Sequence, residues 1–247
     1  MFPIRDHNPS ERTPYVTYAL IAANVLIYLY GLAALQTDQA INQFYYDYAM
    51  IPARISAGEN YISLLTSIFL HGGFMHLAGN MLFLFIFGDN MEDEMGHLPF
   101  LLFYLLSGLG ADLAQFATEP YSTIPTVGAS GAIAGVMGGY LLLFPKARVD
   151  ILLFIIIYVR IFPIPAWIML GLWFGLQLLN GLGADASQGG VAYWAHAGGF
   201  VIGLALTVPL WLRRGAAGFW RRTDGHPPHP EATYPAIKSR IPVVRRR

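Results

Sequence analysis

Cysteine is absent from the 247 residues, and charged residues are scarce. Without cysteine the chain can hold no disulfide framework, no thiol nucleophile and no thiolate metal site. Charged residues make up 12% of the sequence, whereas a soluble domain carries about 25%. The formal net charge is +0, so no general attraction to nucleic acid is expected and none is predicted as a partner. Hydrophobic residues reach 55% and the mean hydropathy is +0.47, which indicates a membrane protein.

Six stretches with few or no charges are long enough to cross a bilayer, whose core of about 30 Å requires about 20 residues of helix. We predict an all-α polytopic membrane protein built as a bundle of six transmembrane helices. A further apolar run, 151–159, is too short to span the membrane by itself. We expect it to lie at the membrane interface or to extend the fifth span. The predicted spans are residues 15–35, 61–88, 98–117, a part of 121–145 that begins after Pro125, 166–183 and 191–212.

Lysine and arginine collect on one side of these spans. If the N-terminus is cytoplasmic, fourteen of the fifteen basic residues lie on the cytoplasmic side and only Arg54 lies outside, which is the bias typical of cytoplasmic loops. Both termini are therefore predicted to be cytoplasmic. Residues 1–13 lack a signal-peptide pattern and are predicted to form a cytoplasmic N-terminal segment before a membrane domain at 14–212. Residues 213–247 contain much Arg, Pro, Gly and His but little apolar surface, which predicts a flexible basic tail near anionic lipid headgroups.

Polar side chains are few inside the predicted spans, and each is costly in hydrocarbon unless it faces a cavity or a partner. Ser130, in the stretch GASG at 128–131, begins the fourth span, where free N–H groups and the helix dipole favour a developing anion. His196 begins the sixth span, which also runs from outside to inside. The two residues therefore lie at similar depth near the outer membrane face. The main polar side chains in the spans are His71, His76, Asn80, Asp112, Ser130, Gln177, Asn180 and His196.

Glycines recur at every fourth position on the fourth and sixth spans. Small residues at this spacing let two helix backbones approach closely. We expect this packing to bring Ser130 and His196 together. The repeated glycines are Gly131, Gly135 and Gly139 on the fourth span, and Gly199 and Gly203 on the sixth.

The second span carries His76 and Asn80, which lie four residues apart and so on one face of a helix. Neither is acidic, and the zinc-protease pattern HExxH is missing, so no metal site is predicted. The pair is suited instead to donating hydrogen bonds to an oxyanion. His71 lies about 140° round the helix from His76, and we expect it to be structural.

Three motifs occur in order along the chain: HxxxN at 76–80, GASG at 128–131 and AHAGG at 195–199. Together they resemble the rhomboid intramembrane serine proteases, of the bacterial type with a six-span core, over residues 14–212. The resemblance implies that the protein cuts transmembrane substrates near the outer membrane face with a Ser–His dyad and no third acid. It implies that Ser130 is the nucleophile and His196 the general base. His76, Asn80 and the backbone N–H of Ser130 would form the oxyanion hole.

The resemblance also implies supporting roles for other residues. The fifth span would act as a gate for the substrate, with Trp173 and Phe174 as candidate gate residues. The expected partners are transmembrane protein substrates and membrane lipids, and no cofactor is expected. The expected location is a multi-pass position in the plasma membrane, specifically a prokaryotic inner membrane. The motif glycines that would support the site are Gly128, Gly131 and Gly199.

Two positions depart from the family pattern. Many rhomboids carry a Trp-Arg pair in the first outer loop, but residues 59–62 read Glu-Asn-Tyr-Ile here. Many also have an aromatic residue one turn after the serine that stacks on the histidine, whereas this chain has Ala134. Another group must then orient the ring of His196, and the sequence pattern does not identify it.

Two other functions use the same polar residues. An inactive relative could bind membrane helices without cutting them, but such proteins usually lack one of the two dyad residues, and both are present. A small-solute transporter would show a matching repeat in its two halves, and the chain has no such repeat. Because hydrolysis consumes water, the protease hypothesis predicts an outward-opening polar cavity at the level of Ser130, between the second, fourth and sixth spans.

Overall fold

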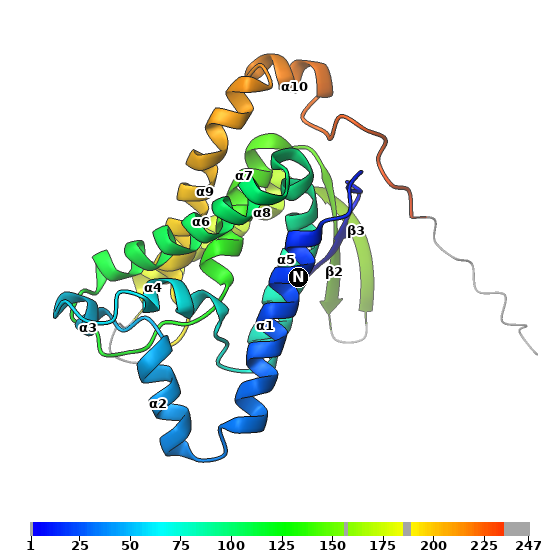
Figure 1. The fold of residues 1–247 in the computed structure, drawn as a ribbon. Helices are drawn as coiled ribbons and strands as arrows, with labels where there is room; N and C mark the ends of the chain where they lie inside the picture. The colour runs from blue at the N-terminus through cyan, green and yellow to red at the C-terminus, as the bar shows by residue number, and fades with distance from the viewer. Residues whose placement is uncertain (1, 156–157, 185–188, 235–247) are drawn as a thin grey trace, which may run out of the picture.

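The computed structural model describes residues 2–155, 158–184 and 189–234. The described chain is mostly helical, and a small sheet lies beside the helix bundle (Figure 1). In chain order the elements are β1 (Phe2–Asp6), α1 (Tyr15–Ala34), α2 (Asp38–Tyr48), α3 (Pro52–Ser56), α4 (Ser63–Thr66), the 3₁₀ turn η1 (Ser67–Phe69), α5 (Phe74–Met95), α6 (His97–Thr118), α7 (Ser130–Leu143), β2 (Arg148–Ile155), β3 (Tyr158–Pro165), α8 (Ala166–Gly183), α9 (Tyr193–Arg213) and α10 (Ala217–Thr223).

Four of the described helices, α1, α6, α8 and α9, are long and apolar enough to cross a membrane. The segment Ser63–Phe69 and α5 form a pair bent by 92°, which makes a fifth span if the pair is counted as one. The helix α7 is apolar but has only 14 residues. The predicted fold class, a polytopic bundle of membrane helices, is confirmed.

The second predicted span, 61–88, has different bounds in the structure. Its helix α5 begins at Phe74 and continues to Met95, and residues 70–73 separate it from the short turns α4 and η1. In these turns Leu64 and Ile68 are buried, and α4 packs against α6. The span was misplaced because an apolar run reads the same whether it faces lipid or the protein interior.

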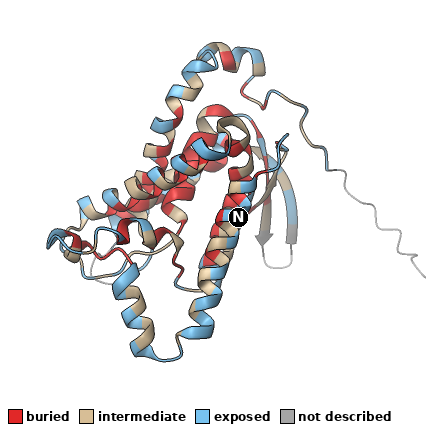
Figure 2. Cartoon of the chain, in the orientation of Figure 1, coloured by how far each residue is buried: buried red, intermediate tan, exposed pale blue. Residues whose placement is uncertain are grey.

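The helix α7 lies at the centre of the bundle. Eleven of its fourteen residues are buried, and Figure 2 shows buried positions concentrated in the central helices. A Cβ atom at Gly199 on α9 would lie 2.1 Å from the carbonyl oxygen of Gly131, and one at Gly203 would lie 2.2 Å from that of Gly135. These distances leave no room for any side chain, so the glycine repeats bring the backbones of α7 and α9 into direct contact.

The N-terminus and the C-terminal ends of α5 and α9 meet at one end of the bundle, the end predicted to be cytoplasmic. The carboxylate of Glu92 on α5 accepts hydrogen bonds from the N–H and the hydroxyl of Thr17, both at 2.7 Å. It thereby caps the first turn of α1, whose N–H groups have no partner within the helix. Arg214, which follows α9, pairs with Glu94 at 2.5 Å. The N-terminal residues of α7 and α9, including Ser130, lie toward the opposite end.

The apolar run 151–159 does not extend the fifth span but belongs to a β-hairpin. Strands β2 and β3 pair antiparallel, and β1 pairs antiparallel with β2, so the strand order is β1-β2-β3. β-Branched and aromatic residues favour extended backbone, and Pro163 and Pro165 lack the N–H that a helix interior requires. Because Pro165 is the N-cap of α8, the helix begins after it. Residues 156–157 of the run lie outside the described residues.

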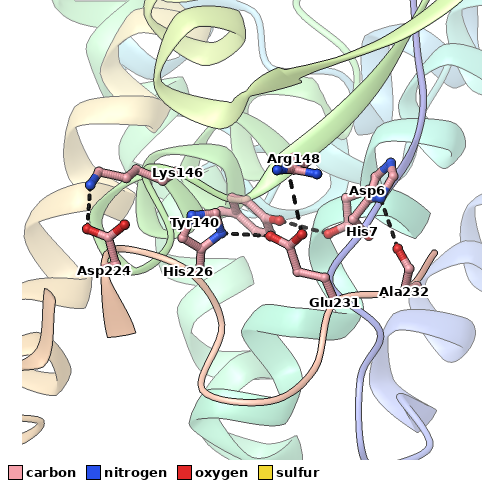
Figure 3. A network of polar contacts seen from close by, with 9 residues as sticks. All are labelled: Asp6, His7, Tyr140, Lys146, Arg148, Asp224, His226, Glu231 and Ala232. Carbon is pink, nitrogen blue, oxygen red and sulfur yellow. Dashed lines mark hydrogen bonds and ion pairs between the residues drawn. The ribbon is translucent and has the colours of Figure 1, made fainter. Parts of the chain in front are cut away.

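Part of the predicted flexible tail is ordered against the N-terminal strand (Figure 3). After α10, the side chain of Asp224 pairs with Lys146 at 2.5 Å, and the N–H of Ala232 donates to the carbonyl oxygen of His7 at 2.9 Å. Residues 217–234 thus make specific contacts with the rest of the chain, and the flexibility expected of 213–247 stays a prediction. These contacts include hydrogen bonds and ion pairs, which a count of apolar surface does not detect, and also the buried side chain of Phe219. Residues 235–247 lie outside the described residues.

His7 joins the N-terminal segment to Ala232 through one ring nitrogen and to Asp150 on β2 through the other, an arrangement that we call the terminal clasp. Nδ1 lies 2.9 Å from the carbonyl oxygen of Ala232, and Nε2 lies 2.9 Å from Oδ1 of Asp150. Both oxygens can only accept hydrogen bonds. Burial raises the pKa of Asp150, but the hydrogen bonds from His7 and Arg5 outweigh it, so the pKa lies below its ordinary value of 3.8.

Candidate active site

Ser130 is the first residue of α7, and the turn before it depends on glycine. Gly128 has φ +132°, a conformation that favours glycine over residues with a side chain. A Cβ atom at this position would also lie 2.8 Å from the ring of His76 and 3.4 Å from Ser130 Oγ. The absence of a side chain at Gly128 therefore lets the turn form and lets His76 approach the serine.

Contacts with η1 hold this turn in place. The N–H of Gly128 donates to the carbonyl oxygen of Ser67 at 3.0 Å, and Ser67 Oγ donates to Asp112 Oδ2 on α6 at 2.5 Å. The three residues that these two hydrogen bonds connect lie in or beside the central helices, and Ser67 and Asp112 are buried. The buried carboxyl of Asp112 thus has a structural partner and anchors the turn that carries Ser130.

His196 on α9 meets Ser130 directly. Its Nε2 lies 2.8 Å from Ser130 Oγ, although the two residues are 66 positions apart in the sequence. The contact between the backbones at Gly131 and Gly199 sets the two helices at this distance. A hydroxyl within hydrogen-bond range of an imidazole nitrogen can lose its proton to that nitrogen as the oxygen attacks an electrophile.

The second ring nitrogen of His196 contacts Gln177, a residue of α8 to which the sequence analysis assigned no role. Gln177 Oε1 lies 2.9 Å from His196 Nδ1, and Gln177 Nε2 donates to the carbonyl oxygen of Trp173 at 3.3 Å. The Trp173 ring also lies beside the imidazole, with centroids 5.8 Å apart. These residues hold the ring that Ala134, with its small side chain, does not reach. The available signal was an amide side chain in an apolar span, which Gln177 shares with Asn180.

The predicted oxyanion donors lie on the other side of Ser130, on α5. The ring of His76 lies next to Gly128, as described above, and packs edge-on against the ring of His71 with centroids 5.0 Å apart. Asn80 Nδ2 lies 2.9 Å from His71 Nε2. An amide nitrogen carries two hydrogens, so this contact leaves one for a substrate oxygen. His71, which is buried, orients Asn80.

A cavity of about 760 Å³ opens at these residues. It is lined by His76, Asn80, Ser130 and His196, together with Trp173 and loop residues that include Ser122 and residues 124–127. Of the two candidate gate residues, Trp173 lines the cavity, whereas Phe174 stacks on Phe200 of α9 with ring centroids 4.7 Å apart. Among the residues that the structure describes, no group of three or more His, Asp or Glu side chains is placed to hold a metal ion.

Comparison with known proteins places the chain in a family. The family model of the rhomboid domain matches residues 58–213. The chain belongs to the rhomboid family. It is 31% identical to the mitochondrial Rhomboid protein 1 of Saccharomyces cerevisiae over 195 residues, which are 76% of this chain and 51% of that protein. It is 34% identical to the Rhomboid protease GluP of Bacillus subtilis over 128 residues, 52% of this chain and 24% of that protein.

A third relative is RHOMBOID-like protein 5 of Arabidopsis thaliana, 39% identical over 87 residues, which are 35% of this chain and 28% of that protein. The chain spans about half or less of the length of these relatives. The rhomboid domain contains every residue of the site, including Gln177, whereas α1, β1 and the clasp residue Ala232 lie outside the match. Rhomboid-family membership and the apolar helices identify an integral membrane protein. Because the relatives include bacterial and mitochondrial proteins, the prokaryotic plasma membrane stays a prediction.

Proposed function

We propose that this rhomboid is an intramembrane serine protease that hydrolyses peptide bonds in or near the transmembrane helices of membrane-protein substrates. The observation that carries the proposal is the 2.8 Å contact between Ser130 Oγ and His196 Nε2. Serine is a weak nucleophile unless a positioned base takes its proton. The contact supplies that base inside a cavity large enough to admit a peptide segment.

The first half of the reaction forms an acyl-enzyme. Ser130 Oγ attacks the carbonyl carbon of the scissile bond while its proton passes to His196 Nε2. The tetrahedral intermediate then collapses, the C–N bond breaks, and His196 gives the proton to the leaving nitrogen. In the second half, a water molecule gives a proton to His196 and attacks the ester carbonyl. Collapse of this second intermediate returns the proton to Ser130 Oγ and releases the new carboxyl end.

The negative oxygen of each intermediate needs hydrogen-bond donors. The backbone N–H of Ser130 at the start of α7, the ring of His76 and the amide of Asn80 are the proposed donors. The helix dipole at the N-terminus of α7 also favours negative charge at this position. Loss of one oxyanion donor typically lowers the rate by about 10² to 10³-fold, so we expect losses of this size for His76→Ala and Asn80→Ala.

The proposed substrates are transmembrane helices that arrive from the lipid. A helix engages its own carbonyl groups in hydrogen bonds, so the substrate must unwind locally before Ser130 can reach one. Glycine or proline near the cut favours this unwinding. The basic residues on the opposite side support a site near the outer membrane face, with cleavage close to that surface.

A serine-directed fluorophosphonate tests the proposal on the purified protein in detergent. Wild-type protein should be labelled, and Ser130→Ala should abolish the label. Ser107→Ala is the control, because Ser107 is buried in the bundle, whereas Ser130 is partly exposed, and the Ser107 hydroxyl has no hydrogen-bond partner among the described residues. Absence of label on folded wild-type protein, or a label that survives Ser130→Ala, would support an inactive helix-binding rhomboid or a transporter instead.

A further inference from the structure

The acceptor for His196 Nδ1 comes from α8, a helix on the outside of the bundle. We propose that Gln177 is a positioning residue that holds His196 in the one tautomer able to act as the base, and that it makes the alignment of the base depend on the seating of α8 against α9. This inference rests on the proposed protease function. It adds a third member to the Ser–His pair and assigns that member to a peripheral helix.

The hydrogen-bond pattern around Gln177 admits one arrangement. Its Nε2 donates to the carbonyl oxygen of Trp173, which is an acceptor only, so Oε1 is the atom that faces His196. Because Oε1 accepts only, His196 Nδ1 must carry the hydrogen. The lone pair of a neutral ring then lies on Nε2, 2.8 Å from Ser130 Oγ. The opposite tautomer would place a hydrogen where the serine proton must go.

A neutral amide suits this position. An ionised carboxylate in the same place would be costly in the membrane interior unless it were paired. Gln177 is 8% exposed and does not line the cavity. Its effect on the reaction is therefore expected to pass through His196 and not through contact with a substrate.

The contact between α8 and α9 is a narrow stripe with Gln177 in its middle. Phe174 stacks on Phe200 on one side of it. On the other side, a Cβ atom at Gly181 would lie 3.2 Å from the ring of Trp194. Only five of the eighteen residues of α8 are buried. A helix held by so narrow a stripe can separate from its neighbour at low cost compared with the central helix α7.

A small displacement of α8 is enough to release the base. The Gln177–His196 bond is 2.9 Å long, and a separation of about 3.6 Å is no longer a hydrogen bond. A movement of less than about 1 Å away from α9 would therefore free the imidazole to rotate or change tautomer. The site would be competent when α8 is seated and misaligned while α8 is displaced.

Two substitutions at position 177 test whether Gln177 positions His196. Gln177→Met keeps the length of the side chain but removes the acceptor, whereas Gln177→Glu keeps an acceptor. For cleavage of a transmembrane peptide, we expect Gln177→Met to lower kcat about 10-fold, near the upper limit for one neutral hydrogen bond, with KM within twofold. The rate of fluorophosphonate labelling should fall equally. Gln177→Glu should recover at least half of both losses.

The dependence on the position of α8 is tested by substitutions that disturb the packing of α8 against α9 without changing Ser130 or His196. Gly181→Val places methyl groups against Trp194 and should lower the labelling rate, while Gly175→Val, at a glycine with no atom within 4 Å of its Cβ position, should leave it unchanged. Because Gly181→Val and Gln177→Met break the same bond, the double variant should lose no more than the worse single variant. Additive losses would overturn the coupling to α8.

The remaining outcomes separate this inference from the proposed function. If wild-type protein is labelled at Ser130 but Gln177→Met retains kcat within twofold, the role of Gln177 is refuted and the protease proposal stands. If Gln177→Met raises KM and leaves kcat unchanged, Gln177 contacts substrate and is not a positioning residue. If wild-type protein is not labelled, the proposed function fails and this inference fails with it.

Discussion

Replacing Gly199 with alanine tests whether the backbone contact between α7 and α9 assembles the active site. The added methyl group would lie 2.1 Å from the carbonyl oxygen of Gly131, and ordinary contacts begin at 3.4 Å. Restoring such a contact requires α9 to retreat by about 1.3 Å at this level. The obstacle is backbone, which cannot rotate away as the end of a flexible side chain can.

A retreat of α9 would also separate Ser130 from His196. Ser130 Oγ and His196 Nε2 are 2.8 Å apart, and a retreat of that size would separate them by about 4 Å, beyond hydrogen-bond range. General base catalysis contributes about 10² to 10⁴-fold to a rate, so we expect Gly199→Ala to lower the rate of fluorophosphonate labelling at least 100-fold. Overpacking should also reduce stability by about 1–3 kcal/mol.

The labelling rate and thermal unfolding of purified protein measure the two effects. Gly171→Ala is the matched control, because a Cβ atom there would meet no atom of the described residues within 4 Å outside the adjoining turns of its own helix. Both quantities should match those of wild type. If Gly199→Ala is labelled at the wild-type rate with unchanged stability, close contact between α7 and α9 is not what positions the dyad.

Three further predictions concern parts of the chain outside the dyad. The pKa of Asp150 is lowered in the folded protein, so its contact with His7 stabilises the fold above the ordinary pKa of 3.8. This stabilisation is lost as pH falls through the lowered value. The difference in thermal stability between wild type and Asp150→Asn should therefore be present at pH 7 and vanish in acid. Burial, and then repulsion from the carboxylate of Asp89, raises the pKa of Asp6 well above its ordinary value of 3.8. Ionisation of this carboxyl therefore destabilises the fold as pH rises above 3.8 towards the raised value, and Asp6→Asn should flatten the decline of wild-type thermal stability over that range. Removing the hydroxyl donor to the buried carboxyl of Asp112 by Ser67→Ala should lower the free energy of unfolding by about 1–3 kcal/mol in denaturant titrations, and an unchanged value would show that this bond does not anchor the turn before α7.

Much of the helical architecture could be predicted from the sequence. The bounds of α1, α6, α8 and α9 lie within two residues of the predicted spans, because the length of an apolar run and the cost of charge in a bilayer are properties of a single segment. Ser130 and His196 could be chosen in the same way. Each begins an apolar helix, and the glycine spacing on the two helices indicated that their backbones approach.

Other features could not be predicted, because they depend on what a segment packs against. Residues 63–69 fall within an uncharged stretch, but Leu64 and Ile68 are buried in the protein, and α4 packs against α6. Residues 151–155 of the apolar run form strand in part because β1, from the N-terminal end of the chain, supplies a hydrogen-bonded edge. Residues 224–234 make ion pairs and hydrogen bonds with residues distant in the sequence, such as Lys146 and, more than two hundred positions away, His7.

Gln177 illustrates the difference between what the sequence determines and what the tertiary structure determines. Composition and periodicity marked it as a costly amide inside a span, and nothing local to α8 indicated its partner. Only the tertiary structure placed it 2.9 Å from His196 Nδ1. The sequence determines which residues are chemically suited to the reaction, since this depends on side-chain type and on position in a helix. Which of them meet is decided by the packing of the helices, since hydrogen bonds form over about 3 Å and such distances are set only when the bundle is assembled.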